Sequence, residues 1–121
     1  LVNFSKKSID GIVTEPILLP NLKRHPNERK TKELLKITQK TYVKAMISMN
    51  RILRENGRLV IVTPRVKTNR GKFISLDILY MIKESGFRFN RIHKNNQPII
   101  VKYSKEQKII REVWVMQKKI I

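Results

Sequence analysis

Several residue types that usually carry chemistry are absent or rare in this chain of 121 residues. It contains no cysteine, which excludes disulfide bonds and thiolate metal sites. Its two histidines, His25 and His93, are far apart and lack the spacing of metal ligands, so no structural zinc site is expected. No serine occupies a nucleophile elbow, and Asp10, Glu15 and Asp77 are not spaced as paired catalytic acids.

Glycine is also scarce. The four glycines, Gly11, Gly57, Gly71 and Gly86, lack the spacing of a loop that cradles phosphates or a dinucleotide. An α/β enzyme normally binds a nucleotide-like cofactor at such a turn, between its first strand and helix. No segment approaches the roughly 18 apolar residues of a membrane-spanning helix. We therefore expect no membrane partner and a cytoplasmic location.

Acidic residues are few compared with basic ones. The chain has 27 Lys and Arg against 9 Asp and Glu, which gives a formal net charge of +18. Such an excess predicts a polyanionic partner, because cations that neutralise phosphates release counterions and attract nucleic acid at long range. A solvated, lysine-rich surface is the alternative explanation. With 40% apolar residues the chain can form the modest core of one domain.

An apolar run near the start predicts the first strand, from about Ile9 to Thr14. Because the run is continuous, we expect a strand covered by helices on both faces. Pro16 and Pro20 cannot donate to a strand ladder, so pairing should end there. Ligands bind at the carboxyl ends of strands in open α/β sheets, which makes Thr14 to Pro20 the first candidate site.

A long helical pattern follows, between about Asn27 and Asn56. Asn56-Gly57 supplies a left-handed residue that should end this helix. The apolar side chains on one face recur with helical spacing and should point to the core: Leu35, Tyr42, Met46, Met49 and Leu53, with Leu34, Ala45 and Ile52 beside them.

A second strand should run from Arg58 to Thr63 and stop at Pro64. A second helix is expected from Ser75 to Ser85, ended by Gly86, with Leu76, Leu79 and Ile82 (or Met81) facing the sheet. The alternation in Phe87 to His93 predicts a third strand with one exposed side.

Two apolar runs near the end, Ile99–Tyr103 and Ile109–Met116, flank a turn. Periodicity alone does not separate helix from strand here, but their β-branched and aromatic content favours strands. The expected order is strand, helix, strand, helix, strand, strand. It predicts an α/β sheet whose first strands are parallel and whose last hairpin is antiparallel.

Basic loops follow the first two strands. Both should project from the same carboxyl rim as Glu15, where they could bind nucleic-acid phosphates. Solvated loops are the alternative. The candidate substrate-binding cations are Lys23 and Arg24 in the first loop, and Arg65, Lys67, Arg70 and Lys72 in the second.

Residues 9–20, the long helix and residues 51–64 together resemble the second half of a Rossmann-like S-adenosylmethionine-dependent methyltransferase. More narrowly, they resemble the RNA methylases related to THUMP-containing enzymes that methylate the 2-amino group of a tRNA guanosine. That family carries Asp-Pro-Pro-Tyr or Thr-Glu-Pro-Tyr-Leu-Gly-Pro at this strand end. Residues 97–98 and 110–115 are also similar to its closing segment.

The resemblance implies roles for the residues of this motif. Glu15 matches the acidic group that accepts from the base amine, and the backbone from Thr14 to Pro16 would accept too. Pro20 matches the second proline of the longer motif. Ile17 replaces the aromatic residue that would stack on the extruded base, and Leu19 replaces a glycine.

The same resemblance implies S-adenosylmethionine as cofactor and RNA, most simply tRNA, as substrate. The half of the domain that carries the glycine-rich cofactor loop does not match any part of the chain, so residues 1–121 form a partial domain that should not bind the cofactor alone. The outer edge of the first strand should then be covered by the missing half or by a partner chain. A non-catalytic RNA-binding module and a DNA adenine methylase fragment remain alternatives.

Overall fold

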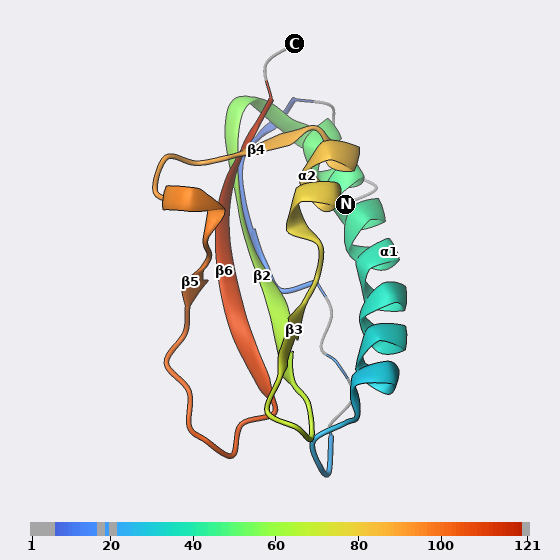
Figure 1. Cartoon of the computed structure of the whole chain (residues 1–121). Helices are drawn as coiled ribbons and strands as arrows, with labels where there is room; N and C mark the ends of the chain where they lie inside the picture. Colours follow the sequence, from blue (N-terminus) through green and yellow to red (C-terminus); the bar gives the residue numbers. More distant parts are fainter. Residues whose placement is uncertain (1–6, 17–18, 20–21, 120–121) are drawn as a thin grey trace.

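The protein forms a mixed sheet with two helices, as seen in a computed structural model that describes residues 7–16, 19 and 22–119. Figure 1 shows the long helix α1 lying along the sheet, with the shorter α2 beside it. The elements in chain order are β1 (Ile9–Thr14), α1 (Glu28–Ile52), β2 (Leu53–Lys67), β3 (Phe73–Ser75), α2 (Ile78–Ser85), β4 (Phe87–Phe89), the 3₁₀ turn η1 (Lys94–Asn96), β5 (Ile99–Ile100) and β6 (Ile109–Lys118).

The sheet has the strand order β1-β2-β6-β4. The first two strands are parallel, and β6 runs antiparallel between β2 and β4. The short β3 pairs with β2, and β5 pairs antiparallel with β6. The expected α/β sheet with parallel first strands and an antiparallel last hairpin is therefore confirmed. The hairpin partner β5 is short, and β6 makes its longest ladder with β2.

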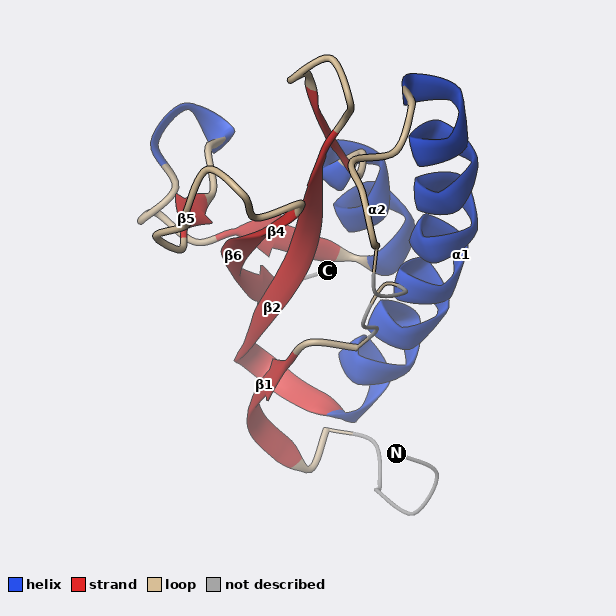
Figure 2. Cartoon of the chain, turned by 90° about the horizontal axis from the view of Figure 1, so that it is seen from below, coloured by secondary structure: helices blue, strands red, loops and turns tan. Residues whose placement is uncertain are grey.

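Both helices pack on one face of the sheet (Figure 2). The core lies between the helices and the sheet, where Tyr42 and Met46 of α1 meet Leu59, Ile61 and other apolar side chains. The expectation that β1 is covered on both faces is wrong, because the Val13 side chain is 78% exposed. A continuous apolar run indicates which residues prefer burial, but it does not supply the element that covers the second face.

Helix α1 begins where the sequence indicates. Asn27 is its N-cap, and its Oδ1 accepts from the Lys30 backbone N–H at 2.7 Å. The expected end at Asn56-Gly57 is wrong, because the helix stops at Ile52 and the chain turns directly into β2. Asn56 does have a left-handed backbone, with φ of 62°, but within an irregularity of β2. A Cβ on Gly57 would lie 2.7 Å from the carbonyl oxygen of Arg54, so this bend requires glycine.

The second strand continues past the proline that was expected to end it. Pairing of β2 with β1 stops at Ile61, and pairing with β3 begins at Arg65. Pro64 lies in the gap between these two partners, so its missing N–H removes no bond from either ladder. The strand therefore extends to Lys67.

Helix α2 is shorter than expected. Ser75 belongs to β3, and Asp77 caps α2 by accepting from the Tyr80 N–H at 3.2 Å. Leu79 was expected to face the sheet, but its side chain is 56% exposed and Met81 is buried instead. Leu76 is buried and Ile82 packs against the core, as expected. Gly86 ends α2 in the left-handed conformation, as expected.

His93 has a structural role beside β6. Its ring lies against Phe89 and Trp114, with centroid distances of 6.0 and 5.2 Å. Its Nε2 accepts from the Val115 backbone N–H at 2.7 Å, so its Nδ1 carries the proton donated to the Gln97 carbonyl oxygen at 2.9 Å. The expected strand over Phe87 to His93 accordingly shortens to β4, and the chain turns after Phe89.

Neither helix in the described part of the chain is long and apolar enough to cross a membrane.

Candidate active-site rim

The predicted acidic motif lies at the carboxyl end of β1. Thr14 is the last residue of the strand and pairs with Ile61 of β2. Glu15 follows directly, and its Oε2 accepts from the Arg111 Nε at 3.0 Å. The other carboxylate oxygen, Oε1, has no hydrogen-bond partner among the described residues.

A pocket of about 190 Å³ opens beside Glu15. Tyr42 forms a rigid part of its wall, because it is fully buried and its hydroxyl donates to the Val62 carbonyl oxygen at 3.0 Å. The pocket combines one acid and one base with apolar and amide groups, a mixture suited to a flat heterocycle with polar edges. Its lining residues are Glu15, Leu19, Tyr42, Pro64, Gln107, Ile109 and Arg111.

Arg65 does not line this pocket, and it forms an ion pair with a buried carboxylate. Its Nε donates to the Glu112 Oε2 at 2.7 Å, and Glu112 is only 3% exposed. The Ser75 hydroxyl donates to the same oxygen at 2.8 Å, and the Thr63 hydroxyl donates to Oε1 at 3.2 Å. The charge of Arg65 is thus matched inside the protein.

The loops after β1 and β2 do meet at one end of the molecule. The Asn69 N–H donates to the Pro26 carbonyl oxygen at 2.8 Å, and the His25 Nδ1 lies 3.1 Å from the Lys67 carbonyl oxygen. A second pocket of about 680 Å³ lies between these loops and the start of α1. Its polar lining is predominantly basic, and its residues are Leu22, Lys23, Arg24, His25, Pro26, Asn27, Lys30, Leu34 and Asn69.

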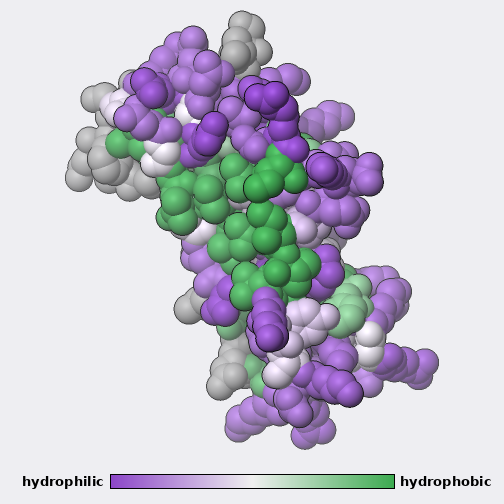
Figure 3. All heavy atoms as spheres, turned by 90° about the vertical axis from the view of Figure 1, so that its left-hand side faces the viewer, coloured by the Kyte–Doolittle hydropathy of each residue, from purple (hydrophilic) through white to green (hydrophobic). Residues whose placement is uncertain are grey.

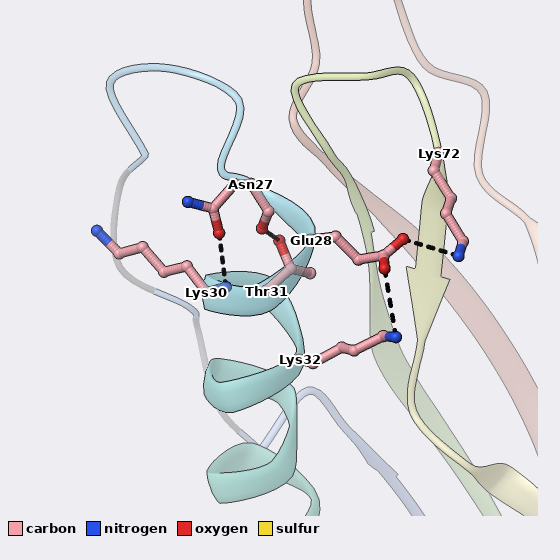
Figure 4. Close-up of polar contacts among 6 residues, drawn as sticks. All are labelled: Asn27, Glu28, Lys30, Thr31, Lys32 and Lys72. Carbon is pink, nitrogen blue, oxygen red and sulfur yellow. Dashed lines mark hydrogen bonds and ion pairs between the residues drawn. The ribbon is translucent and has the colours of Figure 1, made fainter.

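Lys72 is paired at the start of α1, as Figure 4 shows. Its Nζ lies 2.8 Å from the Glu28 Oε1, and the Lys32 Nζ lies 3.4 Å from Oε2 of the same carboxylate. The hydrogen bond from Lys72, followed by the charge of Lys32, lowers the pKa of Glu28 below its usual 4.5. Two of the six predicted substrate-binding cations, Arg65 and Lys72, therefore have carboxylate partners.

The other four lack such partners. Lys23, Arg24, Lys67 and Arg70 make no ion pair with any residue the structure describes. The Lys67 Nζ lies 6.0 Å from the centre of the Phe73 ring. Ile17 and Pro20, which were also predicted at the site, fall outside the described residues.

The described residues do not fit a cofactor site for S-adenosylmethionine. Gly11 lies within β1 and Gly57 within β2, while Gly71 and Gly86 bend a loop and end a helix. None of the four forms a glycine-rich turn between a strand and a helix. The described part of the chain also has no group of three His, Asp or Glu side chains that could hold a metal ion.

Arg111 is the site residue that sequence reasoning missed. It is half-exposed, it lies opposite Pro64 in the β2–β6 register, and its partner Glu15 is 96 positions away in the sequence. The only local signal is that a cation interrupts the apolar strand 109–116. Such a signal does not identify a partner, because register across a sheet is a non-local property.

No protein-family model and no curated protein matches the chain. Similarity appears instead with solved structures. A protein from Thermus thermophilus, described as a DNA modification methylase and crystallised with S-adenosyl-L-methionine, superposes with a TM-score of 0.60 and 20% identity. The match covers 98% of this chain and 49% of that one.

A second neighbour is a SAM-dependent methyltransferase from Methanosarcina mazei, with a TM-score of 0.55 and 13% identity. Here the match covers 98% of this chain and 63% of the other. The chain thus spans about half to two thirds of the length of these neighbours. At such low identities the comparison shows the fold alone: the mixed α/β sheet of this chain matches part of the fold of two solved methyltransferases.

Proposed function

We propose that this chain is the substrate-side part of an S-adenosylmethionine-dependent methyltransferase that acts on an exocyclic amino group of a base in RNA, most simply tRNA. The observation that carries the proposal is the position of Thr14-Glu15-Pro16 at the carboxyl end of β1, beside a pocket and within a methyltransferase fold. A cytoplasmic location is part of the same proposal.

Glu15 has the central role at this rim. Its Oε1 accepts one hydrogen of the base amine, while the ion pair with Arg111 fixes the orientation of the carboxylate. The main-chain carbonyl oxygens from Thr14 to Pro16 accept the other hydrogen. Two acceptors orient the nitrogen lone pair, and such positioning supplies much of the rate enhancement in a direct transfer.

Lys23, Arg24, Lys67 and Arg70 bind the backbone phosphates around the target nucleotide. They are unpaired with carboxylates in the described structure, so phosphate binding does not require breaking an ion pair. Arg65 and Lys72, in contrast, act mainly as structural cations, because Glu112 and Glu28 already neutralise them.

S-adenosylmethionine supplies the methyl group, and it binds to residues beyond this chain. The described glycines provide no loop for it. We therefore expect no binding of S-adenosylmethionine to the 121-residue chain in titration calorimetry.

A DNA base is a second candidate substrate, because the T. thermophilus neighbour is described as a DNA modification methylase. An adenine amino group in DNA presents the same donor hydrogens to Glu15 as an amino group of an RNA base. The pocket residues alone do not distinguish an RNA base from a DNA base as the group that receives the methyl. A non-catalytic RNA-binding module is the alternative from another class, favoured by Ile17 in place of an aromatic residue.

The test is methyl transfer from labelled S-adenosylmethionine by the longest open reading frame that contains this chain. Bulk tRNA and duplex DNA serve as separate acceptors. We expect label on tRNA, and a loss of roughly 100-fold with Glu15→Gln, which is the cost of misorienting a reactant by about 1 Å. Glu84→Gln is the matched control, because Glu84 is exposed on α2 and should leave the rate unchanged.

Each other outcome has a distinct meaning. Label on DNA alone replaces the RNA substrate by a DNA base. Equal rates for Glu15→Gln and wild type show that Glu15 does not hold the amine. Binding of tRNA without any transfer supports the non-catalytic module.

A further inference from the structure

Two aromatic side chains from distant parts of the chain form an exposed pair. Phe73 begins β3, and Tyr103 lies in the segment between β5 and β6. Their ring centroids are 6.4 Å apart and their planes meet at 69°, which is a favourable edge-to-face arrangement. The two residues are still 40% and 43% exposed, so much of their surface remains in contact with solvent. We call Phe73 and Tyr103 the aromatic pair.

Cations without carboxylate partners lie beside the aromatic pair. The Lys67 Nζ is 6.0 Å from the centroid of the Phe73 ring. Lys102 and Lys105 flank Tyr103 in the sequence, and both are exposed. None of these three lysines makes an ion pair with a residue that the structure describes. The pair is thus surrounded by positive charge, which a packing role for the two rings does not require.

The loops that carry the aromatic pair lie at a hydrophilic end of the molecule. Figure 1 shows the β2–β3 loop and the β5–β6 turn at the same end. Hydrophilic side chains gather at this end in Figure 3, below an apolar band. The turn itself carries one acid, Glu106, against Lys102, Lys105 and Lys108. A polyanion that contains flat rings therefore fits this end better than an apolar protein surface does.

The aromatic pair lies near the smaller pocket but outside it. Phe73 pairs with Lys67, whose N–H donates to the Lys108 carbonyl oxygen at 2.9 Å, and the next residue, Ile109, lines the pocket beside Glu15. Neighbouring strands are about 4.8 Å apart, so the Phe73 backbone lies roughly 10 Å from this wall of the pocket. Neither ring of the pair lines the pocket. A base stacked on the pair would thus differ from the base held beside Glu15.

We propose that the aromatic pair stacks on an unpaired base of an RNA strand, while Lys67, Lys102 and Lys105 bind the adjoining phosphates. Proteins that bind single strands combine aromatic rings, on which bases stack, with cations that follow the backbone. The inference rests on the proposed function and extends it, because it gives the RNA a second contact near the target base. It also requires the RNA to be single-stranded around that base.

The test measures binding of a short fluorescent oligouridine to the longest open reading frame that contains this chain. Fluorescence anisotropy compares wild type with Tyr103→Leu, which keeps an apolar side chain against Phe73 but removes the ring. We expect roughly 10-fold weaker binding, because the stacked base loses its platform. Tyr103→Trp supplies another ring and should keep the wild-type affinity. Tyr80→Leu is the matched control, because Tyr80 is 48% exposed on α2 and should leave the affinity unchanged.

A second comparison separates stacking from charge. An oligomer of abasic sugars keeps every phosphate but offers no base. Loss of the bases should weaken binding by wild type about 10-fold more than binding by Tyr103→Leu, as a double-mutant cycle measures. Duplex RNA should bind equally to both proteins, because its base faces are stacked within the helix. Unchanged duplex binding also shows that the variant is folded.

Several results would overturn the proposal. Equal affinities of wild type and Tyr103→Leu for oligouridine would show that no base stacks on the pair. Equal losses on oligouridine and duplex RNA, or with Tyr80→Leu, would indicate an effect without a specific platform. Tighter binding of oligothymidine through Tyr103 would make a DNA strand the ligand instead. Stacking without any methyl transfer would leave this inference standing and count only against the proposed function.

Discussion

Glu112 is a buried carboxylate that accepts hydrogen bonds from Thr63, Arg65 and Ser75. Its Oε1 partner Thr63 also accepts from the Trp114 Nε1 at 3.1 Å, so the network reaches into the core. Removal of one partner from a buried ion pair leaves the other charge uncompensated.

We predict that Glu112→Gln destabilises the protein by about 3 kcal/mol, near the lower end for buried pairs because Arg65 is partly exposed. Urea unfolding measures this value. The double variant Arg65→Met with Glu112→Leu should recover most of the loss, since it removes both charges together. A double variant less stable than the single one would show that the network contributes more than charge balance.

Two glycines with nearly the same φ allow a matched test of steric contact. Gly86 has φ of 77° and Gly71 has φ of 78°. An added Cβ at Gly86 would lie 3.2 Å from the Asn50 Nδ2, which itself donates to the Gly86 carbonyl oxygen at 3.0 Å. At Gly71 an added Cβ meets nothing within 4 Å.

Gly71→Ala should therefore cost only the left-handed backbone penalty, about 1 to 2 kcal/mol. Gly86→Ala should cost more, because the turn must also shift away from Asn50. Thermal melts of both variants measure the difference. Equal losses would mean that Asn50 moves without cost.

At the scale of elements, the stability contributed by the ion pairs at the N-terminus of α1 should depend on pH. The hydrogen bond from Lys72 and the charges of Lys72 and Lys32 hold the pKa of Glu28 below 4.5. A carboxyl with a lowered folded-state pKa stabilises the fold above its unfolded pKa, and loses that effect as the pH falls through the folded value. The link between α1 and the β2–β3 loop should thus weaken in acid.

We predict that wild type loses more stability than Glu28→Gln when the pH falls from about 7 to about 3. Thermal melts over this range, together with an NMR titration of the Glu28 carboxyl carbon, measure the effect. Glu84→Gln is the control and should follow wild type. A midpoint for Glu28 at or above 4.5 would contradict the assigned contacts.

Local sequence patterns predicted which helices and strands exist better than they predicted the residues at which these elements end. The buried face of α1 was predictable, because Leu35, Tyr42 and Met46 recur with helical spacing over a long segment. The helix end was not, since Asn56 has the left-handed backbone expected of a stop but forms a bend in β2. The prediction that the strand stops at Pro64 was wrong for a related reason. A proline ends strand pairing only where a neighbouring strand needs its missing N–H as a hydrogen-bond donor.

The candidate site was predictable only where its parts are local. Thr14-Glu15-Pro16 could be placed at a strand end from the sequence, because the apolar run stops there. Arg111 could not be paired with Glu15, and Glu112 could not be paired with Arg65, because β6 inserts between β2 and β4. No local pattern encodes that strand order.

At the scale of the whole molecule, the net charge of +18 should dominate binding to nucleic acid. The logarithm of the affinity for single-stranded RNA falls with the logarithm of salt concentration, by roughly 0.7 for each phosphate neutralised. Replacing Lys23, Arg24 and Arg70 by glutamine should reduce that slope by about 2. Fluorescence anisotropy with a labelled RNA at several salt concentrations gives the slope.

The matched control removes the same charge from another surface. Lys36, Lys40 and Lys44 are exposed on α1, and their replacement by glutamine should change the slope much less. Equal changes for the two triple variants would show that binding follows total charge and that the loops form no specific site.

The ion pair between Glu15 and Arg111 has a consequence for biosynthesis. Its two residues are separated by 96 positions, and Arg111 reaches Glu15 only when β6 lies beside β2. While the ribosome makes the chain, β1, α1 and β2 emerge first and expose the slot that β6 later fills. The rim formed by Thr14-Glu15-Pro16 is thus completed only after β6 has been made, so a nascent chain that stalls before residue 111 carries this motif without the ion pair that holds the Glu15 carboxylate.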